Sequence, residues 1–256
     1  MGCLRHLLTG LADRFGWLRG VLSGPWKVVQ AIEREEPNVP RSPMPVTWLE
    51  ALVVSSLTMR WFNMAAALLL GFFALLRPAE LYGLRREDIL TESEHHMGRF
   101  LLVRLKRPKS RWRGAAQQYV RVDEPRVVQG LTMLLKRLPR QALVWPMSPS
   151  RFAMRLKRLS EAVIGKIFGV LPSSLRTGGA TWFFQASGEH LTRLLWRGRW
   201  RDARVLGSYI QEITAAILNA RLSDDDAHRV ASLAAFFGKW LSTLVIQFGD
   251  RSVDDF

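Results

Sequence analysis

The chain has 256 residues, of which 48% are hydrophobic and 23% charged, so it holds ample material for a packed core and does not resemble a disordered protein. Its single cysteine, Cys3, excludes an internal disulfide framework and a zinc site built on several thiolates. Lysines and arginines number 37 against 22 acidic residues, which leaves a formal net charge of +15. A folded protein this basic usually binds a polyanion, most often nucleic acid, although ribosomal and membrane-surface proteins share this charge balance.

Two helical segments and a proline-rich linker are predicted at the N-terminus. Apolar residues recur at helical spacing over residues 4–22, and a shorter helix is expected over residues 26–34, after a glycine–proline pair ends the first. Four prolines then fall within nine residues, too many for a helix or a central strand. We therefore expect a linker here, with a domain boundary near residue 41.

The next segment is strongly apolar. Thr47 and Glu50 have the spacing of a capping box, which predicts a helix that continues through Thr58. A second helix is expected over residues 62–76. Its nearly apolar run, Met64 to Leu76, has 13 residues. Spanning a bilayer takes about 18 or more, so this run predicts a buried core helix rather than a transmembrane segment.

Arg77 stands between this apolar run and Pro78. Proline disrupts a helix interior but suits the first turn of a new helix, so one helix should end just before Arg77 and another begin at Pro78. The residue before a proline is held extended. Because an unpaired buried charge is costly, Arg77 is expected either to pair with Glu80, three residues on, or to face a cleft that receives an anion.

A small sheet and further helices are predicted after the apolar segment. Residues 99–105 and 118–122 have the composition of two strands, joined by a basic turn. Helical patterns return over residues 124–138, over residues 150–168, and from Ser174 nearly to the end of the chain. The predicted fold class is therefore α+β, mostly helical, with one small antiparallel sheet.

Two clusters of basic side chains with interleaved tryptophans, at residues 99–113 and 193–204, are candidates for phosphate contacts. Guanidinium groups bind phosphate in a bidentate manner, and an indole N–H can donate to a phosphate oxygen. A solvated face with amphipathic tryptophans beneath it explains either cluster equally well. The candidate DNA-binding residues in these clusters are Arg104, Arg107, Arg111, Arg113, Arg197, Arg199 and Arg201.

Two longer motifs carry a resemblance to a known family. Residues 74–89 read ALLRPAELYGLRREDI. Later, SSLR stands at residues 173–176 and GRW at residues 198–200, and Tyr209 follows nine residues after the tryptophan. These motifs resemble the two signatures of the tyrosine recombinase (phage integrase) superfamily, the second of which combines His-x-x-Arg, Gly-His or Gly-Trp, and a nucleophilic tyrosine. The resemblance covers residues 41 to about 215.

The resemblance implies that family's DNA breaking–rejoining fold in residues 41–256, with residues 1–40 as the truncated remnant of an N-terminal core-binding domain and its linker. It implies a site-specific recombinase or integrase that cleaves and rejoins double-stranded DNA through a 3′-phosphotyrosyl intermediate, without a metal or other cofactor. The implied catalytic residues are Arg77, Lys109, Arg176, Trp200 and Tyr209. The implied supporting or alternative residues are Lys106, Ser173 and Glu80.

Each of these residues has an expected role in the implied reaction. A phenol has a pKa of about 10, so the nucleophile Tyr209 needs its proton withdrawn or positive charge nearby. Arg77 and Arg176 would hold the non-bridging oxygens of the scissile phosphate and stabilise its transition state, with the tryptophan donating to the same group. Lys109, or Lys106 as the other hairpin candidate, would protonate the departing 5′ oxygen.

Ser173 stands where most members of the family have histidine. Serine can hydrogen-bond a phosphate but does not titrate near neutral pH as imidazole does. General-base assistance to Tyr209 is thereby weakened, and this departure supports an alternative: a catalytically inactive DNA-binding relic of such a recombinase. A basic protein of a membrane surface is a third hypothesis.

Two further features concern packing and partners. Gly178 and Gly179 each lower helix stability by about 1 kcal/mol, and so indicate close packing or a close approach of DNA. Residues 227–248 carry apolar side chains on one helical face, which predicts either packing within the chain or, as in the family, docking on a neighbouring copy. The resemblance implies a homo-oligomer, a tetramer on DNA, located inside the cell in the nucleus or nucleoid, with no membrane partner.

Overall fold

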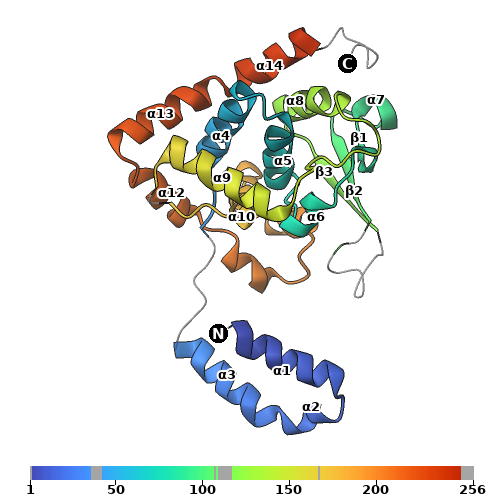
Figure 1. The fold of residues 1–256 in the computed structure, drawn as a ribbon, viewed down its shortest axis with the longest axis vertical. Helices are drawn as coiled ribbons and strands as arrows, with labels where there is room; N and C mark the ends of the chain where they lie inside the picture. The colour runs from blue at the N-terminus through green and yellow to red at the C-terminus, as the bar shows by residue number, and fades with distance from the viewer. Residues whose placement is uncertain (1, 36–41, 107, 109–116, 167, 249–256) are drawn as a thin grey trace. The chain divides into compact units, whose positions relative to one another are not determined.

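The structure, a computed structural model, describes residues 2–35, 42–106, 108, 117–166 and 168–248. The chain forms two compact units, Met1–Pro40 and Arg41–Phe256. In residues 2–35, the described part of the first unit, the chain forms three helices: α1 (Gly2–Arg14), α2 (Leu18–Val21) and α3 (Ser23–Glu35) (Figure 1).

The first unit differs from its prediction at one point. The single helix predicted over residues 4–22 is wrong, because the chain turns between α1 and α2, where Gly16 lowers the stability of a continuous helix. The turn lets α1 contact α3, and a small core forms from Leu8, Leu22 and Val29. The second predicted helix is confirmed as α3, although it begins a few residues earlier than expected.

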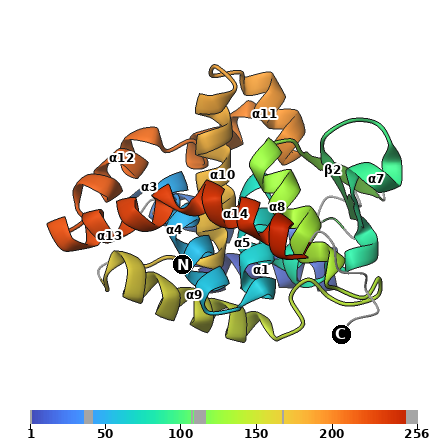
Figure 2. The ribbon, with the colours of Figure 1, turned by 90° about the horizontal axis from the view of Figure 1, so that it is seen from above.

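The core of the second unit is built on two apolar helices in contact, α4 (Val46–Thr58) and α5 (Phe62–Phe73). Residues Met64 to Phe73 of α5 are all buried, which confirms the predicted core helix, although it ends three residues early. No helix in the described part of the chain is both long enough and apolar enough to cross a membrane. Three further helices pack around this pair: α8 (Pro125–Lys136), α9 (Pro149–Ile164) and α10 (Pro172–Ala186) (Figure 2).

Two predicted helix starts have different outcomes. The capping box at Thr47 is wrong, because α4 begins at Val46, with Pro45 rather than Thr47 as its N-cap and no side-chain cap. The start at Pro78 is confirmed: α6 (Pro78–Tyr82) begins there, and Arg77 is the extended N-cap residue (φ −70°, ψ 148°).

Within the described residues, the sheet has three antiparallel strands in the order β1-β2-β3. They are β1 (Ile89–Leu90), β2 (Leu101–Leu105) and β3 (Gln118–Val122). Along β2, buried residues alternate with partly exposed ones, as expected for a sheet with one face on the core. The predicted class, a mostly helical α+β protein with a small antiparallel sheet, is confirmed. The sequence did not predict β1, which is only two residues long.

The C-terminal third is a run of short helices rather than long ones. They are α11 (Leu191–Gly198), the 3-10 helix η2 (Ala203–Ser208), α12 (Glu212–Ala220), α13 (Asp224–Ala235) and α14 (Phe237–Phe248). The amphipathic stretch 227–248 is thus divided at Phe236 between α13 and α14. In Figure 1, α13 and α14 (red) lie across the core, where α13 contacts α4 and α14 contacts α8. Of the two predictions for this stretch, the structure shows packing within the chain.

The glycine pair of α10 is explained by close helix packing. A Cβ at Gly178 would lie 2.0 Å from the carbonyl oxygen of Met44, and a Cβ at Gly179 would lie 2.1 Å from that of Phe72. Both obstacles are backbone atoms, which a rotamer change cannot move aside. The pair therefore lets α10 approach the end of α5 and the residues that precede α4.

We expect Gly179→Ala to destabilise the protein by about 3 kcal/mol, because the added methyl must displace backbone. Alanine's better helix propensity, about 1 kcal/mol, offsets only part of this cost. The melting temperature should fall by roughly 6–12 °C. Gly207→Ala is the control, since a Cβ there meets nothing within 4 Å. Equal melting temperatures for the two variants would contradict the close approach.

Candidate active site

The site begins with an ion pair at the start of α6. Because Arg77 is the N-cap residue, Glu80 occupies the third helical position, from which a carboxylate can reach back to the N-cap. Glu80 Oε2 accepts from the backbone N–H of Arg77 at 2.8 Å, and Glu80 Oε1 accepts from Arg77 Nη1 at 2.8 Å. The Glu80 side chain is only 5% exposed. The pairing expected at this helix start is present.

A second arginine, Arg199, binds the same carboxylate from the end of α11. Its Nη1 and Nη2 donate to Glu80 Oε1 and Oε2 at 3.1 and 3.0 Å, and Nη2 also donates to the carbonyl oxygen of Leu75 at 3.1 Å. The sequence placed Arg199 among surface residues that contact DNA. The structure instead buries its side chain, because Glu80 and Leu75 together satisfy the guanidinium inside the protein.

Arg176 of α10 is the most deeply buried arginine of the site, with 3% of its side chain exposed. Its Nη1 and Nη2 donate to the carbonyl oxygens of Leu75 and Gly198, both at 2.6 Å, and Nη1 lies 4.0 Å from Glu80 Oε2. Leu75 follows the end of α5 in a left-handed conformation (φ 49°). Its carbonyl group is therefore outside the helix and available to both buried arginines.

Two aromatic rings cover Arg176. Its Cζ atom lies 4.6 Å from the ring centroid of Trp200 and 5.7 Å from that of Tyr209, and the two ring centroids are 4.8 Å apart. The backbone holds Tyr209 in place, since its carbonyl oxygen accepts from Thr181 Oγ1 of α10 at 2.9 Å. Four predicted catalytic residues thus lie in one cluster. We define the arginine cluster as Arg77, Glu80, Arg176, Arg199, Trp200 and Tyr209.

The arginine cluster has an excess of positive charge, because three guanidinium groups share the single carboxylate of Glu80. Burial, then repulsion from Arg77 and Arg199, lowers the pKa of Arg176 to about 9, so the group stays protonated at neutral pH. Burial opposes ionisation of Glu80, but Arg199 and Arg77 outweigh it and hold its pKa below the ordinary value. An anion placed against these guanidinium groups would reduce their mutual repulsion.

Access to the cluster differs among its arginines. Arg77 is 24% exposed, whereas Arg176 and Arg199 are almost fully buried. Two backbone carbonyls and two rings enclose Arg176, so the two arginines expected to hold the phosphate oxygens differ in their exposure to solvent. Each terminal guanidinium nitrogen carries two hydrogens, so Arg176 keeps donors beyond those two bonds. Arg77 is therefore the most solvent-exposed of the three arginines.

The hairpin lysine that the structure describes belongs to a separate charge cluster. Lys106 Nζ lies 2.7 Å from Glu87 Oε1 and 2.9 Å from Asp88 Oδ1, and Arg104 also binds Asp88 at 3.0 Å. The hydrogen bond with Glu87 raises the pKa of Lys106. In the described part of the hairpin, no hydrogen bond or ion pair joins these groups to the arginine cluster. Four predicted residues lie outside the described residues: Lys109, Arg107, Arg111 and Arg113.

The other predicted residues surround α10 and α11. Arg197 is ion-paired with Asp123, and its guanidinium lies over the ring of Phe183, so it is only 11% exposed. Arg201 is exposed. Ser173 is half-buried in the first turn of α10, three residues before Arg176, and therefore on the same side of the helix.

Comparison with known proteins adds no assignment to this geometry. No family model matches the chain, and no curated protein matches it. Among the residues that the structure describes, no group of three or more His, Cys, Asp and Glu side chains could hold a metal ion. The chemistry available in the arginine cluster is that of guanidinium, carboxylate, indole and phenol groups.

Proposed function

We propose that this protein is a tyrosine-type DNA strand transferase, a site-specific recombinase or integrase that acts on double-stranded DNA through a 3′-phosphotyrosyl intermediate. One observation carries the proposal: Arg77, Arg176, Trp200 and Tyr209, which come from distant parts of the chain, meet around a site with excess positive charge. The formal net charge of +15 supports a polyanionic substrate.

The proposed reaction uses Tyr209 as the nucleophile. Its phenol oxygen passes a proton to solvent water and attacks the scissile phosphorus, so that a phosphorus–oxygen bond to tyrosine forms as the bond to the 5′ oxygen breaks. The departing 5′ oxygen takes a proton from a hairpin lysine. Arg77 contacts the non-bridging oxygens as charge develops on them. Attack by a free 5′ hydroxyl reverses these steps and rejoins the DNA, so no external energy source is needed.

An inactive DNA-binding relic is the second candidate, and two observations favour it. Ser173 replaces the expected histidine with a group that does not titrate near neutral pH. Arg176 binds the carbonyl groups of Leu75 and Gly198, so it holds three segments of the fold together whether or not it meets a phosphate. A protein that had lost catalysis would keep these contacts for stability.

The two candidates are separated by covalent capture of DNA. Because the target sequence is not known, the substrate is a pool of duplexes with a randomised segment and a nick a few nucleotides downstream. Cleavage releases a short fragment that diffuses away, so the protein–DNA adduct accumulates. An adduct that survives denaturation and disappears on proteolysis supports the strand transferase. Salt-dependent binding of the same pool without an adduct supports the relic.

The general acid is expected to be Lys109 rather than Lys106, since Glu87 and Asp88 hold the Lys106 proton and make it a weaker acid. Lys109→Ala should slow cleavage by about 10²-fold or more. A substrate with sulfur in place of the bridging 5′ oxygen should restore the rate, because a thiol has a pKa of about 8.5 and its thiolate leaves without protonation. Lys106→Ala is the matched comparison. The reverse pattern would transfer the role to Lys106.

A further inference from the structure

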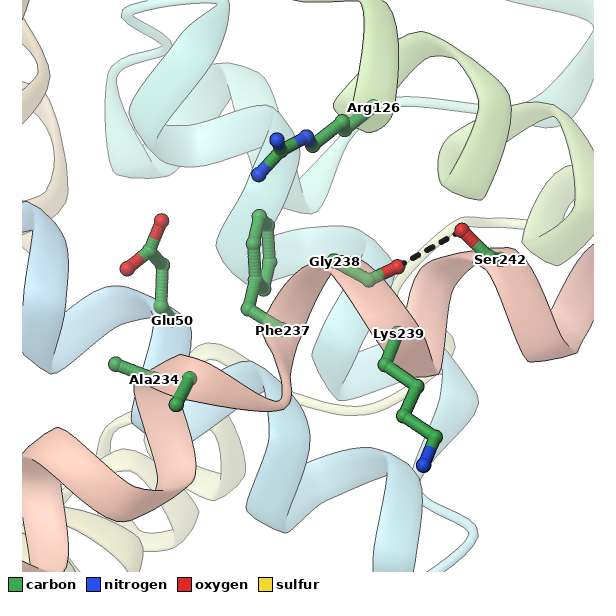
Figure 3. A pocket seen from close by; sticks show the side chains of 8 residues that line it. Glu50, Arg126, Ala234, Phe237, Gly238, Lys239 and Ser242 are labelled. Atoms are coloured by element: carbon green, nitrogen blue, oxygen red, sulfur yellow. Dashed lines mark hydrogen bonds between the residues drawn. The ribbon is translucent and has the colours of Figure 1, made fainter.

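A second candidate site lies away from the arginine cluster, where α13 and α14 meet and cross α4 and α8. It is a hollow of about 520 Å³ (Figure 3). One wall carries Glu50 of α4 and another carries Arg126 of α8, while Ala234, Phe237 and Gly238 line the side formed by α13 and α14. None of these residues belongs to the arginine cluster, and the proposed function leaves this hollow unexplained.

Two opposite charges face this hollow without meeting. In Figure 3, the carboxylate of Glu50 and the guanidinium of Arg126 both point into the space above the α13–α14 junction. Among the described residues, neither group has an ion-pair or hydrogen-bond partner. Burial raises the pKa of Glu50, against the attraction of Arg126 and together with repulsion from Glu124. The half-buried carboxylate thus lacks a counter-ion in direct contact.

The first turn of α14 shapes the space between the two charges. Gly238 lies beside this guanidinium, because a Cβ there would be 3.4 Å from Arg126 Nη1, an ordinary contact distance. Phe237 is 5% exposed and stands between the charged groups in Figure 3, with Ala234 nearby. Lys239 also lines the hollow, but its ammonium group points away from the other two charges. The site therefore pairs two separated, opposite charges with an apolar wall.

We propose that this hollow binds a small zwitterion of the α-amino acid type with an apolar side chain. Its carboxylate pairs with Arg126, its ammonium group with Glu50, and its side chain lies against Ala234 and Phe237. A ligand with only one charge would pair with either Glu50 or Arg126. The other protein group would then be desolvated next to a ligand charge of its own sign, which is unfavourable. Nucleic acid is excluded on the same ground, because Glu50 repels phosphate.

Calorimetry on the full chain, with leucine as the probe, tests the proposal. Leucine should bind saturably, whereas 4-methylpentanoate, which lacks the ammonium group, and 3-methylbutylamine, which lacks the carboxylate, should each bind at least about 10-fold more weakly. The proposal is overturned if leucine gives no binding up to about 10 mM, or if either analogue binds as tightly. This comparison requires no substitution, so it holds even if a variant fails to fold.

Substitutions then locate the ligand. Glu50→Gln and Arg126→Gln should each weaken leucine binding by at least about 10-fold, because each removes one of its two charge partners. Lys136→Gln, which removes an exposed charge elsewhere on α8, is the matched control and should bind leucine as the unmodified protein does. Unchanged binding in the first two variants would place the ligand elsewhere and overturn the proposal. Covalent DNA capture tests the arginine cluster separately, so failure of leucine binding and failure of the proposed function can be told apart.

Discussion

Replacing Tyr209 with phenylalanine is expected to reduce covalent DNA capture by roughly 10³-fold or more, since it removes the only atom that can form the phosphotyrosyl bond. The substitution leaves the ring, which packs on Trp200 at 4.8 Å between centroids and lies near Arg176. Fold and DNA binding should therefore persist. The measurement is the yield of protein-linked DNA from the nicked, randomised pool, beside binding of the same pool at matched salt.

Tyr119→Phe is the matched control for this experiment. Tyr119 lies on β3 and is 58% exposed, so losing its hydroxyl should change neither capture nor melting temperature. If Tyr209→Phe captured as much DNA as the unmodified protein, Tyr209 could not be the nucleophile. If neither protein captured DNA while both bound it, the inactive relic would be the better description.

Replacing Glu80 with alanine is expected to destabilise the protein by about 3–5 kcal/mol, because removing one partner of a buried ionic network leaves the others uncompensated. Arg77 and Arg199 would lose a carboxylate at 2.8 and 3.0 Å, and buried Arg176 would lose its nearest negative charge. The melting temperature should fall by roughly 6–20 °C. Glu80→Gln keeps the shape of the side chain and some of its hydrogen bonds, so it should lose less stability than Glu80→Ala.

Two controls sharpen the Glu80 prediction. Glu87→Ala removes a partly exposed carboxylate that pairs with Lys106, and it should change the melting temperature little. Sulfate should then stabilise Glu80→Ala more than the unmodified protein, because an anion that binds only the folded state restores part of the missing negative charge. Equal stabilisation of both proteins by sulfate would show that the cluster does not attract anions.

The loss of stability at low pH should also depend on the carboxylate of Glu80. Because the folded-state pKa of Glu80 lies below its ordinary value of 4.5, its contribution to stability is complete above that value and is lost as pH falls through the lower folded-state pKa. Melting temperatures measured from about pH 6 to about pH 3 should therefore fall more steeply for the unmodified protein than for Glu80→Gln, which has no carboxylate there to titrate. Parallel curves would mean that Glu80 does not carry the acid sensitivity.

Much of the local structure is predictable from nearest-neighbour chemistry. Proline lacks an N–H and restricts the residue before it, so the start of α6 at Pro78 and the extended Arg77 could be predicted from sequence. The buried helix α5 follows from an apolar run too short to span a bilayer. The strand β1 could not be predicted, because two residues carry no period and its pairing with β2 alone makes it a strand.

The residues of the candidate site were also predictable from the sequence only in part. The resemblance of two motifs to a known family pointed to Arg77, Glu80, Arg176, Trp200 and Tyr209, and the structure places these residues in one cluster. The sequence placed Arg199 on a surface, whereas the folded chain brings it to a carboxylate 119 residues away.

The burial of Arg176 shows why only the tertiary structure could decide the rest. Its two acceptors are the backbone carbonyls of Leu75 and Gly198, at separations of 101 and 22 residues along the chain. Backbone acceptors are the same at every position and leave no trace in the side-chain pattern. Which of them meets a given arginine is settled only when helix ends from distant segments pack together.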